Sequence, residues 1–150
     1  MTAILLWTLL TADQPLPFSH KTHAEAAKLA CKDCHTMADP GERAGIPATA
    51  KCMACHVFVK TDSPAIVKLT AMHKEKRPVP WVRIYEIPGY VFFNHKQHVD
   101  AGAACEKCHG PVAEREVITK EVKHNMGTCM DCHRLNKAPN DCIACHEPRN

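Results

Sequence analysis

Every cysteine in this chain belongs to one short motif, and the motif recurs five times. The pattern is Cys-x-x-Cys-His, and it occurs at residues 31–35, 52–56, 105–109, 129–133 and 142–146. A disulfide framework has no need of a histidine after every second cysteine, and zinc ribbons use such pairs in twos to supply four ligands. Cys-x-x-Cys-His is instead the attachment box of a c-type haem. The sequence therefore predicts five covalently attached haems.

In each box the two cysteines bind the haem covalently and the histidine is the proximal ligand of the iron. The predicted attachment residues are Cys31, Cys34, Cys52, Cys55, Cys105, Cys108, Cys129, Cys132, Cys142 and Cys145. The predicted proximal ligands are His35, His56, His109, His133 and His146. The composition agrees, because a chain of 150 residues with four Phe, two Trp and two Tyr makes a weak core by itself.

A second pattern, Phe-x-His-x-x-His, precedes the first and the third box, at residues 18–23 and 93–98. On a helix, residues three apart lie on the same face. Two such side chains cannot easily turn onto one iron, so each pair is expected to serve two different haems and to hold them in contact. The predicted distal ligands are His20, His23, His95 and His98.

Two histidines remain outside these patterns, His73 and His124. The C-terminal part has three boxes and three candidate histidines, so His124 is the expected distal ligand there. Met126 is the alternative, and a thioether ligand would raise the potential of that haem. His73 lies in a charged run and is expected to be a surface or hydrogen-bonding residue. Six-coordinate haems transfer electrons and leave no position for a substrate, so we expect a carrier and not an enzyme.

The spacing of the boxes suggests four parts. Residues 1–12 are mostly apolar and are expected to be a secretory signal or a short anchor, since they are too few to span a bilayer. Residues 13–60 form a two-haem module, residues 61–91 connect, and residues 92–150 form a three-haem module.

The expected fold is mostly irregular, with short α-helices and a small β-hairpin, built around the haems. Helical composition covers residues 18–30, and a second helix is expected to follow Pro64, which suits the first helical position. Alternating residues at 81–84 and 114–122 predict two short strands that pair.

The predicted haems also change the net charge of the protein. The formal net charge is +3, but the propionates of five haems outweigh it, so a nucleic-acid partner is not expected. Covalent haem attachment takes place on the outer side of the energy-transducing membrane. The protein is therefore expected to be exported and to be periplasmic, membrane-associated or extracellular, with redox proteins as partners.

The segment from Phe93 to His146 resembles the class III multihaem cytochromes c, in particular the small trihaem members. The shared plan is Phe-x-His-x-x-His, a box, a further histidine and then two boxes. The resemblance implies which ligands share an iron: His95 with His109, His98 with His133, His124 with His146 and, by the internal repeat, His20 with His35 and His23 with His56.

Residues 78–134 are similar to the pentahaem subunit of alternative complex III, a quinol-oxidising membrane assembly. The residues that carry the similarity include Pro80-Trp81-Val82-Arg83-Ile84, Cys108-His109-Gly110-Pro111-Val112 and Met126-Gly127-Thr128-Cys129. This resemblance implies a membrane quinol-oxidising complex as a partner, and it favours Met126 as a ligand.

Two other functions fit parts of the pattern. A multihaem nitrite or hydroxylamine reductase needs an open or lysine-ligated haem, and the sequence has no Cys-x-x-Cys-Lys box. A subunit of an extracellular haem filament could supply His73 as a haem ligand to a neighbouring copy of the chain. An oligomer or filament is therefore kept as an alternative.

Overall fold

The computed structural model describes residues 13–147, so the expected signal or anchor at 1–12 lies outside the described residues. The described chain is helical and irregular. Its elements are the π-helical turn η1 (Thr22–Ala26), α1 (Cys31–Cys34), α2 (Thr49–His56), α3 (Pro64–Lys74), α4 (His95–Asp100), α5 (Cys105–His109), the 3₁₀ turn η2 (Val112–Glu114), α6 (Met126–Leu135) and α7 (Ile143–His146). Within residues 13–147, no helix has the length and apolar character needed to cross a bilayer.

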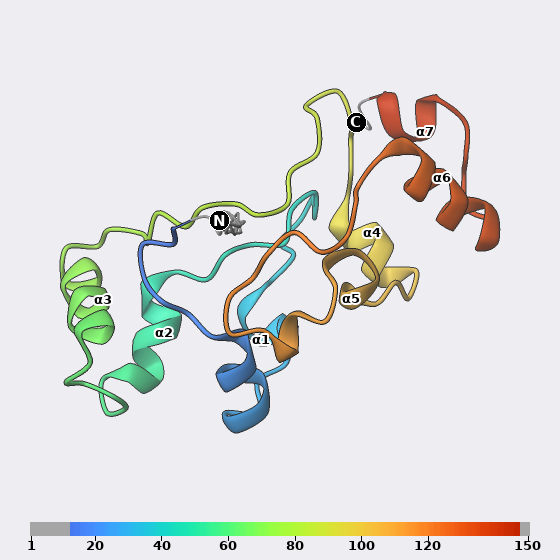
Figure 1. The fold of residues 1–150 in the computed structure, drawn as a ribbon. Helices are drawn as coiled ribbons and strands as arrows, with labels where there is room; N and C mark the ends of the chain where they lie inside the picture. Colours follow the sequence, from blue (N-terminus) through green and yellow to red (C-terminus); the bar gives the residue numbers. More distant parts are fainter. Residues whose placement is uncertain (1–12, 148–150) are drawn as a thin grey trace, which may run out of the picture.

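The helices follow a different order in space from their order in the chain. Figure 1 shows α2 and α3 at one end, α6 and α7 at the other, and α1, α4 and α5 between them. The connection of residues 75–94 runs from α3 along the molecule to α4 (Figure 1). The helix with the first box, α1, therefore lies between the helices with the second and the third box.

Local signals account for where several helices begin. Pro64 is the first residue of α3, as the sequence predicts. The Asn94 side chain accepts a hydrogen bond from the backbone N–H of Gln97 and caps α4. Asn125 caps α6 by accepting from the N–H of Thr128, whose hydroxyl accepts from the N–H of Asn125 in return.

The chain reverses after several helices through residues with positive φ. Four of these residues are lysines, Lys28, Lys60, Lys76 and Lys137, with φ of 56°, 51°, 54° and 53°. Glycine is usual at such a position, but a lysine there places its charge favourably at the negative end of the helix dipole. Gly102, with φ of 85°, ends α4 in the same way.

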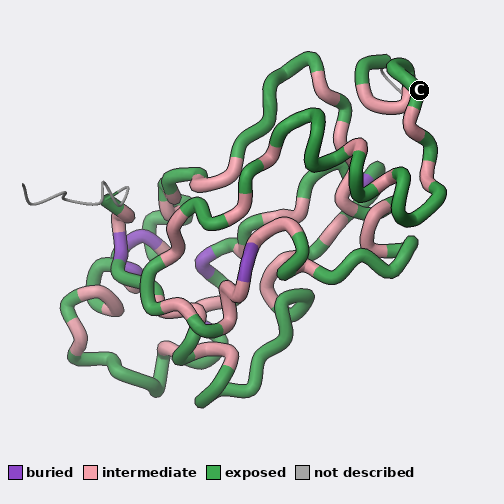
Figure 2. The backbone as a smooth tube through the Cα atoms, turned by 45° about the vertical axis from the view of Figure 1, so that its right-hand side comes forward, coloured by how far each residue is buried: buried purple, intermediate pink, exposed green. Residues whose placement is uncertain are grey.

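The hydrophobic core is small. In the part of the chain that the structure describes, the buried apolar side chains are Leu16, Met53, Leu69 and Met72. Figure 2 shows only a few short buried stretches, and the rest of the described chain is exposed or half-buried. At about 1.5–3 kcal/mol for each fully buried side chain, these residues stabilise the region of α2 and α3 but leave the rest of the chain with little apolar packing of its own.

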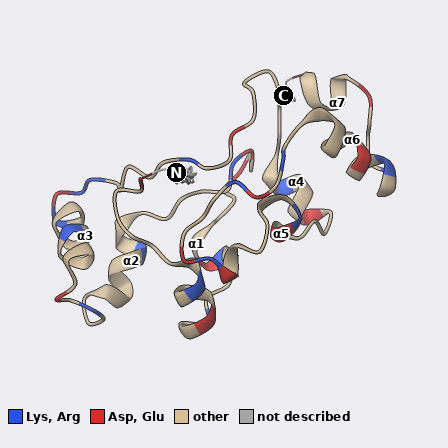
Figure 3. Ribbon diagram, in the orientation of Figure 1, with Lys and Arg blue, Asp and Glu red and all other residues tan. Residues whose placement is uncertain are grey.

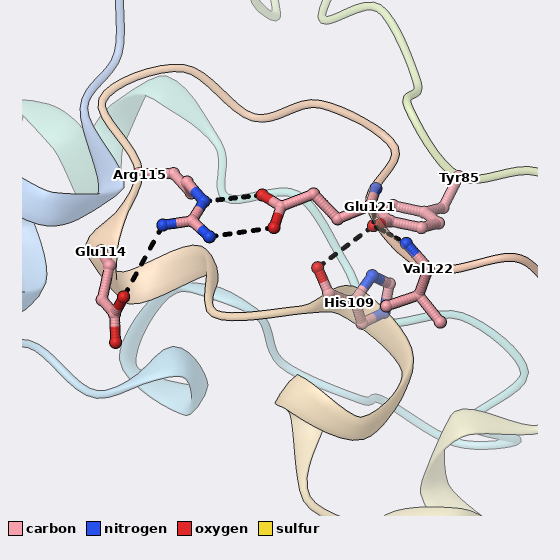
Figure 4. Close-up of polar contacts among 6 residues, drawn as sticks. All are labelled: Tyr85, His109, Glu114, Arg115, Glu121 and Val122. Carbon is pink, nitrogen blue, oxygen red and sulfur yellow. Dashed lines mark hydrogen bonds and ion pairs between the residues drawn. The ribbon is translucent and has the colours of Figure 1, made fainter.

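The predicted β-hairpin is wrong, because residues 81–84 and 114–122 contain no strand. Side chains take the hydrogen bonds that a partner strand would otherwise make. The Gln14 amide donates to the carbonyl of Val82 at 2.9 Å and accepts from its N–H at 3.0 Å. The Tyr85 hydroxyl accepts from the N–H groups of Glu121 and Val122 at 3.0 and 3.3 Å (Figure 4).

The helix expected over residues 18–30 is also shorter than predicted, with η1 covering Thr22–Ala26. Lys28 has positive φ, and the N–H of Leu29 donates to the carbonyl of His23, which ends the turn. The alanine-rich composition favoured a longer helix, and the reversal at Lys28 leads the chain into the first box instead.

Charged residues of both signs are interspersed along the chain (Figure 3). Lys96 pairs with Asp100 at 3.0 Å and Arg134 with Asp131 at 2.6 Å, both within one helix and exposed. Such pairs contribute little to stability. Arg115 donates two hydrogen bonds to the Glu121 carboxylate, at 2.6 and 2.9 Å (Figure 4), and these bonds lower the pKa of Glu121.

We expect Tyr85→Phe to lower the free energy of unfolding by about 1–3 kcal/mol, because it leaves two backbone N–H groups and the His109 carbonyl without the hydroxyl they share. Guanidinium denaturation of the haem-loaded protein measures this. Tyr90→Phe is the control, since its ring is exposed and its hydroxyl makes no hydrogen bond among the described residues. Equal stability losses in the two variants would contradict the role given to Tyr85.

Candidate haem sites

The five Cys-x-x-Cys-His boxes lie on α1, α2, α5, α6 and α7 or directly at their ends, since His35 follows α1 and Cys142 precedes α7. The two cysteines are three residues apart and the histidine is four after the first, a spacing that places side chains on one face of a helical turn. Every cysteine is a free thiol. This is the arrangement that attachment of a flat ring at two points, with an axial ligand beneath it, requires.

The structure brings four box histidines opposite four histidines from the distal set. The ring centroids are 6.4 Å apart for His20 and His35, 6.1 Å for His23 and His56, 6.4 Å for His95 and His109, and 5.9 Å for His98 and His133. The interplanar angles are 8°, 60°, 10° and 46° in the same order.

These separations match the geometry of a six-coordinate iron. An imidazole nitrogen lies about 2 Å from a bound metal and the ring centre about 1 Å beyond it, so two rings on opposite sides of one iron have centroids about 6 Å apart. Rings in direct stacking contact are closer, as the 4.3 Å between Phe18 and His23 shows. The four pairs therefore fit a haem iron between the rings.

Hydrogen bonds to backbone carbonyls hold many of these rings by Nδ1. The donor and acceptor residues are His23 to Ser19, His35 to Gly45, His56 to Val59, His95 to Glu42, His98 to Asn94, His133 to Pro139 and His146 to Tyr90. A carbonyl can only accept, so Nδ1 carries the proton and Nε2 keeps its lone pair. That tautomer is the one that binds a metal through Nε2, with its ring orientation fixed.

Burial keeps two of the remaining rings neutral. It lowers the pKa of His20 to about 4, and repulsion from His35 and His23 adds to the effect. Burial, followed by His124, His95 and His35, lowers the pKa of His109 as well. The buried Nδ1 of His20 has no hydrogen-bond partner. Neutral, half-buried imidazoles suit iron ligation.

The two copies of Phe-x-His-x-x-His have the same local geometry. Phe18 lies 4.8 Å from His20 and 4.3 Å from His23, and Phe93 lies 4.7 Å from His95 and 4.2 Å from His98. In each copy the second histidine donates from Nδ1 to the carbonyl four residues earlier. The repeat in the sequence is therefore a repeat in three dimensions, in which the phenylalanine packs against both histidines.

The residues expected around the fifth box are not brought together in the same way. The ring of His124 lies 4.9 Å from that of Tyr85 and 6.2 Å from that of His109, at 88° to the latter. The His109 separation falls in the range of the four pairs, but Nε2 of His124 donates to the Cys108 carbonyl at 2.7 Å. Among the described residues, the ring beside His146 is that of Tyr90, at 5.8 Å. The side chain of Met126, the first residue of α6, is exposed.

His73, which has no predicted iron, links two helices. Its Nδ1 lies 3.1 Å from the hydroxyl of Thr49, a buried residue at the start of α2. The sequence predicted a surface or hydrogen-bonding residue here, and in the structure the half-buried ring makes a hydrogen bond between α3 and α2.

The cysteine thiols show which boxes are neighbours. Burial is the largest cause of the raised pKa of Cys52 and of Cys31. The next cause is a cysteine from another box, which is Cys34 for Cys52 and Cys105 for Cys31. After burial, Cys132 and Cys129 raise the pKa of Cys108. Burial also raises the pKa of Cys129, the hydrogen bond with Thr128 opposes this, and Cys145 adds a smaller increase. The boxes therefore follow the spatial order two, one, three, four, five, in agreement with the order of their helices in Figure 1.

Comparison with known families agrees with this geometry. The class III cytochrome C family matches residues 7–83, and cytochrome c7 and related cytochromes c match residues 91–147. The chain belongs to the class III cytochrome c family. The predicted resemblance is confirmed, and with it covalently bound c-type haem and electron transfer.

A curated relative is similar over most of the chain. It is the multihaem cytochrome c subunit of menaquinone reductase from Nitratidesulfovibrio vulgaris. The two sequences are 29% identical over 162 aligned residues, which cover 90% of this chain and 77% of the relative.

The ring angles predict two classes of ferric haem. Near-parallel rings act on the same iron orbital and split its dπ pair strongly, whereas rings at a large angle act on different orbitals and split the pair weakly. We expect the His20–His35 and His95–His109 irons to give rhombic low-spin electron paramagnetic resonance signals. The His23–His56 iron, with its rings at 60°, should give a more anisotropic signal with a larger maximum g value. Four identical signals would contradict these pairings.

Proposed function

We propose that the chain carries five covalently attached c-type haems and passes single electrons along them. The observation that carries the proposal is the set of four histidine pairs with ring centroids 5.9–6.4 Å apart, each joining a box to a distal histidine. When bound, haem supplies an iron that alternates between the ferrous and ferric states. Five sites rest on the five boxes, which use every cysteine.

The residues of this chain hold the irons and exclude other chemistry. In the four pairs an imidazole lies on each side of the proposed iron, so no axial position is left for a substrate. Carbonyl acceptors at Nδ1 fix the ring planes, which limits movement of the ligands when the charge on the iron changes. We therefore propose an electron carrier without catalytic chemistry of its own.

The partner is proposed from the relative. That protein is a subunit of a menaquinone reductase, and alternative complex III, which residues 78–134 resemble, also works on quinols. We propose that this chain exchanges electrons with a quinone-linked membrane complex and with a further redox protein. Because haem is attached covalently on the outer side of the energy-transducing membrane, we propose that this carrier is exported and is periplasmic, membrane-associated or extracellular.

Two measurements test the haem content and ligation. Mass spectrometry of the protein made in a host with haem-attachment machinery should show five haem additions, and the reduced spectrum should show low-spin c-type bands. Cys52→Ala with Cys55→Ala should remove one haem and leave four. A protein with fewer haems, or with a prominent high-spin signal in the four paired sites, would contradict the proposal.

The distal ligand of the fifth haem is proposed to be His124 or Met126. In the structure Nε2 of His124 is engaged by the Cys108 carbonyl, and Met126 begins the helix that carries the fourth box. If Met126 is the ligand, ferric protein should show the long-wavelength sulfur-to-iron band, and Met126→Ala should abolish it and lower one midpoint potential. If His124 is the ligand, His124→Ala should convert one haem to high spin and Met126→Ala should not.

A further inference from the structure

One short loop contacts ligands of two different irons. The backbone of residues 41–45 follows the first box and lies against the start of α4. At one end of this loop the Gly45 carbonyl accepts a hydrogen bond from Nδ1 of His35, at 2.8 Å. Near its other end the Glu42 carbonyl accepts from Nδ1 of His95, also at 2.8 Å.

The loop is held firmly on both sides. On the side of the first box, the N–H of Gly45 donates to the Thr36 carbonyl at 2.7 Å. On the side of α4, the Asn94 amide donates to the Pro40 carbonyl at 2.8 Å, and the N–H of Lys96 donates to the Gly41 carbonyl at 3.0 Å. A shift of the loop would therefore move both carbonyls and the first turn of α4.

The internal repeat shows what is special about this contact. His20 and His95 occupy equivalent positions in the two copies of the repeat. The ring of each lies next to the phenylalanine of its own copy, and its centroid is 6.4 Å from that of a box histidine. Nδ1 of His20 is buried without a partner, whereas Nδ1 of His95 has the Glu42 carbonyl. The second copy thus uses a backbone acceptor that the first module supplies.

Further contacts bring the first and third boxes together. The Cys31 and Cys105 side chains are close enough that Cys105, after burial, raises the pKa of Cys31. The backbone N–H of Lys21, next to His20, donates to the Arg115 carbonyl, six residues after His109, at 3.0 Å. The junction between the modules therefore lies at these two boxes and not at boxes two and three, which are consecutive in the sequence.

We propose that residues 41–45 are a shared positioning element for the irons of the first and third haems, so that a change in this loop alters both redox centres together. The inference rests on the proposed haem ligation. An Nδ1–H bond to a carbonyl makes an imidazole a stronger donor to its metal, and its loss frees the ring to rotate. The loop holds one such bond for each of the two irons.

Gly41→Ala tests the inference in the haem-loaded protein. Gly41 is buried with φ of 81°, and a Cβ there would overlap Cβ of Lys96, which cannot move without moving α4. We expect the midpoint potentials and the paramagnetic resonance signals of the first and third haems to shift most. The fourth haem should shift less, because its proposed ligand His98 also lies on α4, and the second and fifth should be unchanged. His20→Met and His95→Met identify these two haems beforehand, since each should raise one potential.

Gly102→Ala is the matched control. Gly102 has φ of 85°, so alanine there meets the same backbone strain, but no atom lies within 4 Å of the new Cβ. Four lysines already adopt similar φ at the ends of other turns, so the fold should accept the change. The first and third haems should keep their potentials in this variant.

Asn94→Ser covers the case in which Gly41→Ala does not load haem. Serine still caps α4 but is too short to donate to the Pro40 carbonyl, so the same two haems should shift by a smaller amount. If neither variant changes this pair, or if all five potentials shift alike, the inference is overturned while the proposed function stands. A wild-type protein without two such bis-histidine haems would overturn the proposed function and the inference with it.

Discussion

The fold depends on histidines that face each other in pairs across about 6 Å, the distance at which two imidazoles share one iron. Few apolar side chains are buried, and most helices are single turns too short to be stable alone. A bond from each ring to a proposed iron joins segments that are distant in the sequence, for instance His98 and His133. If the proposed irons are bound, the short helices hold the ligands, and the ligand bonds in turn hold the helices together.

Backbone carbonyls complete this arrangement. Seven ring Nδ1 atoms donate to carbonyls, and the acceptors lie on loops and turns more often than within helices. Many segments without regular secondary structure are therefore held in place by hydrogen bonds from histidine rings. The loop that follows the first box is an example, because two of its carbonyls are committed to His35 and His95.

The sequence names the candidate ligands, which stay a prediction, whereas its prediction of the backbone around them was poor. The boxes and the repeated Phe-x-His-x-x-His motif depend on residue type and spacing, so the rings that face each other could be named in advance. Residues 81–84 alternate like a strand, but the Gln14 amide meets their hydrogen bonds, and no local pattern signals a contact so distant in sequence. Every residue has a backbone carbonyl, so no residue type in the sequence marks Gly45 and Glu42 as hydrogen-bond acceptors. Tyr85, which joins His109 to residues 121 and 122, was missed for the same reason.

The asymmetry between the two copies of the repeat has a consequence for how the chain can be divided. A fragment of residues 92–150 would contain three complete boxes and the histidines that precede them, and by sequence alone it is a self-sufficient small cytochrome. In the intact chain, however, His95 takes its orientation from Glu42, a residue outside that fragment. The predicted three-haem module thus contains its candidate ligands, but His95 is oriented by a residue outside it, whereas His98 and His133 are oriented from within. The isolated part should therefore differ at His95 from the same part within the whole chain.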